Sequence, residues 1–177
     1  MNLPTGFLSV SQVRTYLRCP RQYEYRYIHG LRSPVTSSLL IGRSFHKAIE
    51  TANRAKLEDG EILSVEDVQD TFSEAWDREK AEVEWEDGED QGQLKDSGLA
   101  MTSHYYQEVG QKLRPKLIEQ GTTVDIDGVP VKVVIDLVER DGKIRDFKTA
   151  KRAPAKDEAD RSIQLSTYAM AYREMTG

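Results

Sequence analysis

The hydrophobic period of the chain changes near residue 122, and this change limits the folds that it can adopt. Before that point, apolar residues recur with helical spacing. Three segments rich in β-branched residues follow, and their side chains alternate between apolar and polar: "TTVDI", "VPVKVVIDLVE" and "KIRDFKTA". Asp127-Gly128 and Asp141-Gly142 separate these segments and are strong signals for tight turns. We therefore predict an antiparallel meander of three strands.

Helices are predicted on both sides of this meander. Ser9 and Gln12 form a capping-box pattern at the start of a short helix, and Pro20 suits the first turn of another, which Gly30 ends. Longer helices are expected over about 37–60, from Ser64 towards Trp85, over 94–120 and over 161–177. This order of helices, strands and helix is typical of an α+β fold, and 177 residues suit one domain.

Charge is distributed unevenly along the chain, whose net charge is −5. Residues 1–47 carry seven Lys or Arg residues against one acidic residue, whereas residues 48–96 carry seventeen acidic residues against five basic ones. Because a polyanion responds to the local potential, the basic N-terminal part is suited to face nucleic acid while the acidic part faces water. The alternative is that the acidic stretch is simply a solvated helix face.

Neither export nor membrane insertion is indicated. The first residues, "MNLPTGFLSV", lack the basic start and apolar stretch of a secretory signal, and no apolar run is long enough to span a membrane. The single cysteine, Cys19, excludes a disulfide within the chain and taken alone is typical of a small core residue. We expect a cytoplasmic protein with no membrane partner.

Two aspartates face each other across the second predicted turn. A two-residue turn at 141–142 places Asp136 opposite about residue 147, next to Asp146. Two carboxylates at such positions repel each other unless a cation, such as a divalent metal ion, lies between them. Lys148 shares a strand face with Asp146 and can orient a water molecule or stabilise charge on a phosphate. Alternatively, both aspartates are exposed strand residues with Lys148 as their salt-bridge partner.

Two helices add polar pairs at i, i+4 spacing. His46 and Glu50 share a face of the helix predicted over 37–60, and Gln164 and Tyr168 share a face of the last helix. Alone, each pair is ordinary, since a single helical histidine is more often a structural residue than a metal ligand.

Together, four stretches resemble the RecB-like branch of the PD-(D/E)XK nuclease superfamily, which includes the nuclease domains of RecB and AddB and exonucleases of CRISPR adaptation. They are "LSVSQVRTYLRCPRQYEYRY", "GRSFHKAIE", "VVIDLVERDGKIRDFKTAK" and "QLSTYAMAY". The resemblance covers about residues 8–50 and 130–172. It implies a restriction-endonuclease-like core with helices around a mixed sheet. We thus expect a single nuclease domain over 1–177, lacking its C-terminal part, with a helical insertion at 61–120.

The resemblance also assigns roles to individual residues. The implied metal ligands are His46, Asp136, Asp146 and the carbonyl of Phe147, and the implied catalytic residues are Asp136, Asp146 and Lys148. Ile135 stands where the family pattern has proline. Gln164 and Tyr168 match the helix that holds the DNA strand beside the active site. Cys19 precedes a proline, as does the first of four iron–sulfur ligands in several relatives, so a 4Fe-4S cluster is expected only if the natural chain continues past Gly177.

The expected activity is Mg²⁺- or Mn²⁺-dependent hydrolysis of DNA, as an exonuclease of repair or recombination with a helicase or recombination partner. Arg14, Arg18 and Arg21 are candidates for contacts with the DNA backbone. The tyrosines of "YEYRY" suit base stacking or, for Tyr23 and Tyr27, packing of a short helix. The alternatives are an inactive DNA-binding or scaffolding module of a helicase–nuclease assembly, and a fragment with an incomplete core.

Overall fold

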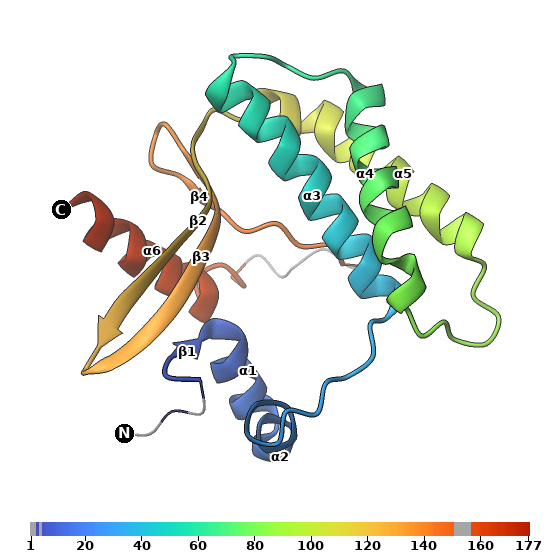
Figure 1. Ribbon diagram of the computed structural model, residues 1–177. Helices are drawn as coiled ribbons and strands as arrows, with labels where there is room; N and C mark the ends of the chain where they lie inside the picture. The colour runs from blue at the N-terminus through green and yellow to red at the C-terminus, as the bar shows by residue number, and fades with distance from the viewer. Residues whose placement is uncertain (1–2, 4, 151–156) are drawn as a thin grey trace.

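The computed structural model describes residues 3, 5–150 and 157–177 (Figure 1). Its elements are β1 (Leu8–Ser9), α1 (Val10–Arg18), α2 (Pro20–Tyr23), α3 (Ser37–Glu58), α4 (Val65–Glu79), α5 (Gln91–Glu108), β2 (Pro115–Ile126), β3 (Val129–Glu139), β4 (Ile144–Arg145) and α6 (Ile163–Thr176). A π-helical turn follows α2, and 3-10 turns follow α4 and α5. The predicted α+β class is confirmed. No helix in the described part of the chain is long and apolar enough to cross a membrane.

Strand β3 is the centre of the sheet. It runs antiparallel to β2 along most of its length, antiparallel to β4 and parallel to β1. The sheet is therefore mixed, as predicted for the restriction-endonuclease-like class, because β1 joins the antiparallel meander. Among the described residues, β2 pairs only with β3, so its other edge carries no further strand there.

The prediction of one helix over 94–120 is wrong for the C-terminal part of that range. The helix α5 ends at Glu108, and β2 begins at Pro115. The apolar pair Leu117 and Ile118 pairs with β3, so tertiary pairing outweighs the helix-forming residues around it. Residues 115–120 of the expected insertion thus lie in the sheet, and the domain division itself stays a prediction.

Three other local predictions differ from the structure. The helix from Ser64 ends at Glu79, short of Trp85, and only Ile144–Arg145 of the third predicted strand pairs with β3. The capping box at Ser9 is half formed. Its hydroxyl accepts the Gln12 N–H, but the Gln12 side chain is buried and donates to Thr5 Oγ1 instead.

The helices α3, α4 and α5 form one of two apolar cores, on one side of the sheet (Figure 1). Each begins at a side chain that accepts a backbone N–H of its first turn: Thr36, Ser64 and Asp90. The largest fully buried side chains of this core are Leu40, Ile49, Val68, Phe72, Trp76 and Tyr106.

The close approach of α4 and α5 depends on Gly98. A Cβ added there would lie 2.5 Å from Phe72 Cζ. We expect Gly98→Ala to lower the free energy of unfolding by roughly 1–2 kcal/mol, since overpacking outweighs the better helix propensity of alanine. Urea unfolding measures this. Ser97→Ala, at an exposed position of the same helix, is the control, and an equal or smaller loss in Gly98→Ala would contradict the packing.

The second core lies between the sheet and α6, and Phe147 connects the helical core to a third, smaller cluster. Val124, Val133, Ile135, Tyr168 and Ala171 are buried in this second core. Phe147 packs against the helical core and also against a small cluster of Leu113, Ile118 and Leu137. The chain from β4 to Phe147 therefore enters the space between the helices and the sheet, where the polar residues described next converge.

Candidate active site

Asp136 and Asp146 occupy facing positions of the β3–β4 hairpin. The register pairs Leu137 with Arg145 and Val138 with Ile144, so its continuation sets 136 opposite 146. The predicted partner was residue 147. The difference arises because the Glu139 N–H bonds the Lys143 carbonyl (2.9 Å), which leaves a loop of three residues rather than two. The two aspartates are therefore more directly opposed than the sequence indicated.

Asp136 is buried, with 8% of its surface exposed, and each of its carboxylate oxygens accepts a hydrogen bond. The Phe147 N–H donates to Oδ2 (2.8 Å), and the Tyr168 hydroxyl donates to Oδ1 (3.1 Å). Burial raises the pKa of Asp136, and Asp146 raises it further, while the Phe147 amide and His46 oppose this shift. The carboxylate is thus held in a fixed orientation but in a setting that disfavours its charge.

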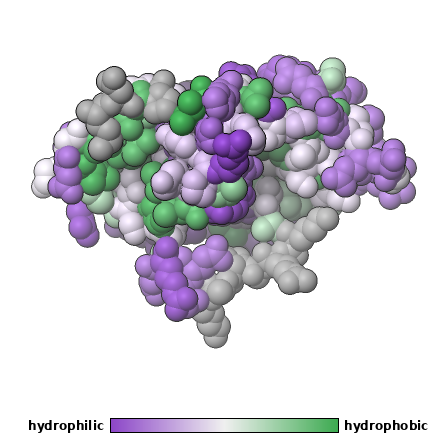
Figure 2. All heavy atoms as spheres, turned by 90° about the horizontal axis from the view of Figure 1, so that it is seen from below, coloured by the Kyte–Doolittle hydropathy of each residue, from purple (hydrophilic) through white to green (hydrophobic). Residues whose placement is uncertain are grey.

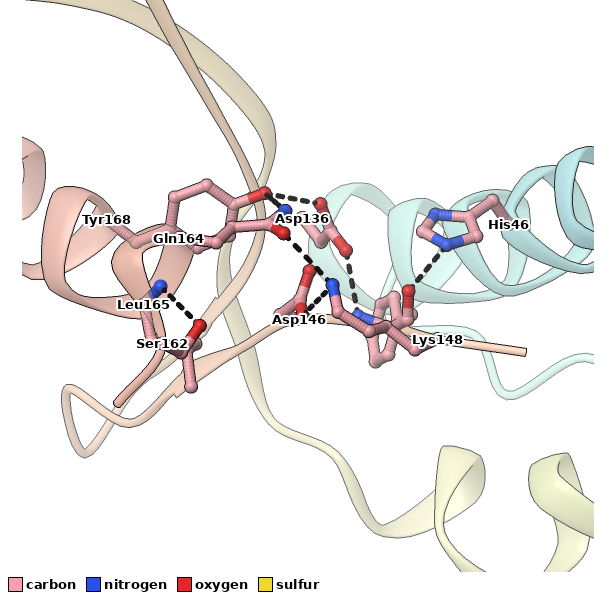
Figure 3. A network of polar contacts seen from close by, with 9 residues as sticks. His46, Asp136, Asp146, Lys148, Ser162, Gln164, Leu165 and Tyr168 are labelled. Carbon is pink, nitrogen blue, oxygen red and sulfur yellow. Dashed lines mark hydrogen bonds and ion pairs between the residues drawn. The ribbon is translucent and has the colours of Figure 1, made fainter. Parts of the chain in front are cut away.

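A chain of polar contacts connects Lys148 to Asp136 through α6 (Figure 3). Lys148 forms an ion pair with Asp146, and its Nζ donates to Gln164 Oε1 (3.0 Å). Gln164 Nε2 in turn donates to the Tyr168 hydroxyl (2.7 Å). Burial raises the pKa of Tyr168, so its hydroxyl keeps the proton that it donates to Asp136. The predicted face shared by Gln164 and Tyr168 is therefore turned towards the aspartates.

His46 approaches the same region from α3. Its Nε2 lies 2.7 Å from the Phe147 carbonyl oxygen, although the two residues are 101 positions apart. The neighbouring Gly42 helps to allow this approach, because a Cβ there would lie 3.1 Å from Thr149 Oγ1. A glycine one turn before His46 therefore lets the segment after Asp146 lie against α3.

Glu119, which the sequence analysis placed in a helix, also points into the site. Ligand atoms of His46, Glu119 and Asp136 lie within 4.8 Å of one another, and Asp146 is not in this group. Glu119 lies on β2, where the pairs Ile118–Leu137 and Gln120–Ile135 bracket it and Asp136. Burial raises the pKa of Glu119, and Asp136 adds to the rise. The sequence analysis would have placed Glu119 beside Asp136 only if the strand predicted at "TTVDI" had been extended back to include "KLIEQG".

Among the predicted DNA contacts, Arg14 shares a recess with two of these residues, Lys148 and Gln164. The recess has a volume of about 310 Å³, and Arg161 and Ser162 are among its other residues. In contrast, Arg18 donates to Gln22 (2.8 Å) and Arg21 forms an ion pair with Glu24 (2.9 Å).

Arg18 and Arg21 lie in a region where exposed apolar side chains adjoin basic ones. The exposed apolar residues are Tyr16, Leu17, Tyr25, Ile28 and Leu31. Figure 2 shows hydrophilic and apolar residues side by side on the face seen from below.

Cys19 separates α1 from α2 and is a free, half-buried cysteine. The ring centroids of Tyr23 and Tyr27 lie 5.1 Å apart.

The described side chains fit a hard divalent cation. The site offers two carboxylates, Glu119 and Asp136, an imidazole nitrogen of His46 and the nearby Phe147 carbonyl. Carboxylate and carbonyl oxygens are the donors that such ions prefer. Burial and the repulsion between the two acids raise both pKa values, and the positive charges of His46 and, for Glu119, of Arg54 oppose this rise only in part.

Tyr168 is a positioning residue for Asp136, and we expect Tyr168→Phe to lower stability by about 1 kcal/mol through the lost hydrogen bonds. The Asp136 carboxylate and the Gln164 amide would each lose a partner. Urea unfolding measures the loss. The control is Tyr172→Phe, whose hydroxyl accepts an exposed bond from Lys116 and has no other hydrogen bond within the described part of the chain. A loss in Tyr168→Phe no larger than in the control would contradict the role of Tyr168.

In the comparison with protein families, the chain matches the model described as PD-(D/E)XK nuclease superfamily over residues 7–177. Comparisons with curated proteins and with solved structures gave no match. The matched range includes β1, the whole sheet, α6 and every side chain of the site.

Proposed function

The chain belongs to the PD-(D/E)XK nuclease superfamily, and on this basis we propose that it is a Mg²⁺- or Mn²⁺-dependent deoxyribonuclease of the RecB-like branch. The observation that carries the proposal is the set of contacts around Asp136. The carboxylate is buried beside a second acid and His46, and α6 connects it to Lys148 and Asp146. Exonuclease action in DNA repair or recombination, with a helicase or recombination partner, is part of the proposal.

The proposed ligands of the metal ion include His46, Asp136, Asp146 and the Phe147 carbonyl. Support comes from the approach of His46 Nε2 to the Phe147 carbonyl and from the facing positions of the two aspartates. When bound, a divalent ion supplies a Lewis acid that polarises the scissile phosphate and lowers the pKa of a bound water molecule.

Lys148 is the residue that we propose to act on the reacting groups. Its ammonium lies between the Asp146 carboxylate and the Gln164 amide oxygen, so its position is fixed from both sides. From there it can hold the attacking water molecule or stabilise negative charge that grows on the phosphate. Gln164 and Tyr168 orient Lys148 and Asp136, respectively.

The recess beside Lys148 is the proposed entry of the DNA backbone. Arg14 lines it with Gln164, and a guanidinium group suits phosphate oxygens. Arg161 also lines the recess but forms an ion pair with Asp157, which lines it together with Glu158. Arg18 and Arg21 remain proposed contacts further along α1 and α2. Cys19 is the only cysteine of the 177 residues, and a 4Fe-4S cluster needs about four such ligands, so the catalytic proposal does not involve it.

The function is tested with end-labelled linear duplex DNA, single-stranded DNA and closed circular plasmid, each in Mn²⁺, Mg²⁺ or EDTA. We expect cleavage in the presence of either ion, none in EDTA, and faster loss of linear than of circular DNA. Equal cleavage in EDTA would contradict a metal-dependent nuclease, whereas rapid cutting of the closed circle would contradict exonuclease action only.

A further inference from the structure

Glu119 is the acidic residue of the site that the resemblance to known nucleases does not assign. It lies on β2, level with Asp136 of the neighbouring strand. The side chains of His46, Glu119 and Asp136 come from three different elements, α3, β2 and β3, yet their ligand atoms lie within 4.8 Å of one another.

The contacts of Glu119 do not indicate a structural role. Among the described residues, its carboxylate has no hydrogen-bond or ion-pair partner, although it is half-buried. The other acids around it are paired. Asp136 accepts two hydrogen bonds, Asp146 pairs with Lys148, and Glu50 pairs with Lys47 and Arg54.

An unpaired, half-buried carboxylate beside a second carboxylate is unfavourable unless a cation joins them. The neighbouring Asp146 forms an ion pair with Lys148, whereas the oxygens of Glu119 have no such partner among the described residues. Glu119 is thus better placed than Asp146 to share a cation with Asp136 and His46 in this arrangement.

We propose that Glu119 is a ligand of the divalent ion and adds a second carboxylate to Asp136 and His46. This inference rests on the proposed function of the same site. It divides the acids into two groups: Glu119 and Asp136 hold the ion between β2 and β3, and Asp146 also fixes Lys148. Loss of Glu119 then weakens metal binding without disturbing the contacts of Lys148.

The test is isothermal titration of the metal-free protein with Mn²⁺, together with thermal unfolding in EDTA. The variants are Glu119→Gln, which keeps the side-chain size, and Glu119→Asp, which keeps the charge. Glu50→Gln is the matched control, since it removes one charge from the acid paired with Lys47 and Arg54 on the helix of His46.

We expect the Mn²⁺ dissociation constant to rise about 10- to 100-fold in Glu119→Gln, less in Glu119→Asp, and less than threefold in Glu50→Gln. The melting temperature of Glu119→Gln in EDTA should equal or exceed that of the wild type, because an unpaired charge is removed. An unchanged Mn²⁺ dissociation constant in a folded Glu119→Gln variant would overturn the inference and leave the proposed nuclease intact. A wild-type protein that binds no Mn²⁺ would overturn both.

Discussion

Asp136→Asn is expected to abolish DNA cleavage and to leave the metal-free protein at least as stable as the wild type. We expect a loss in cleavage rate of roughly a thousandfold or more, because several kcal/mol of metal-dependent charge stabilisation would be lost and each 1.36 kcal/mol is tenfold. Stability should not fall, since the change removes a buried charge that burial disfavours, and the Asn amide oxygen can still accept from the Phe147 N–H.

The dependence of this stability difference on pH follows from the raised pKa of Asp136. Burial raises that pKa above its usual 3.8, so the folded protein binds the proton more tightly than the unfolded chain. The stability that protonation of Asp136 contributes is therefore present below pH 3.8 and lost as pH rises through the folded-state pKa. In EDTA, the melting temperature of Asp136→Asn should exceed that of the wild type by more at pH 8 than at pH 4.

The control is Asp127→Asn, a change at the exposed turn between β2 and β3 that keeps a residue tolerant of positive φ before Gly128. It should retain full cleavage. Cleavage by Asp136→Asn within tenfold of this control would contradict the role of Asp136.

Lys148→Ala is expected to lower the cleavage rate about 100- to 1,000-fold, the range typical for loss of one group that stabilises transition-state charge. Metal binding should be retained or become tighter, because removal of the ammonium frees the Asp146 carboxylate. Single-turnover cleavage at saturating Mn²⁺, combined with Mn²⁺ titration, separates these two effects.

Lys143→Ala provides the matched control for Lys148, since this exposed lysine lies in the same hairpin and pairs only loosely with Asp141. It should cleave DNA at the wild-type rate. If Lys148→Ala lost cleavage only because it no longer bound Mn²⁺, Lys148 would be a structural partner of the metal site and not a residue that acts on the reacting groups.

Local patterns predicted the parts of the site that lie close together in sequence. The turn signal at Asp141-Gly142 brought Asp136 near Asp146, and strand alternation put Lys148 beside Asp146. The register was wrong by one residue because it depends on a single hydrogen bond between Glu139 and Lys143, and turn composition does not determine that bond.

These local patterns did not predict contacts between segments that are far apart in the sequence. No pattern along α3 indicates that His46 meets the carbonyl of Phe147, since this contact depends on how the helical core packs against the sheet. Glu119 was missed because "RPKLIEQ" contains good helix formers, and only pairing with β3 makes this stretch a strand. The resemblance to known nucleases singled out His46, a ligand atom of which lies near those of Asp136 and Glu119, but offered no counterpart for Glu119.

The most direct test of the site is a crystal structure of the protein with Mn²⁺ and an anomalous difference map. We expect one strong peak in direct contact with His46 and Asp136, within reach of Asp146 and the Phe147 carbonyl, and with Glu119 as the additional ligand inferred above. A strong peak elsewhere, with His46 still bonded to the Phe147 carbonyl and no density beside Asp136, would contradict the proposed metal-dependent active site.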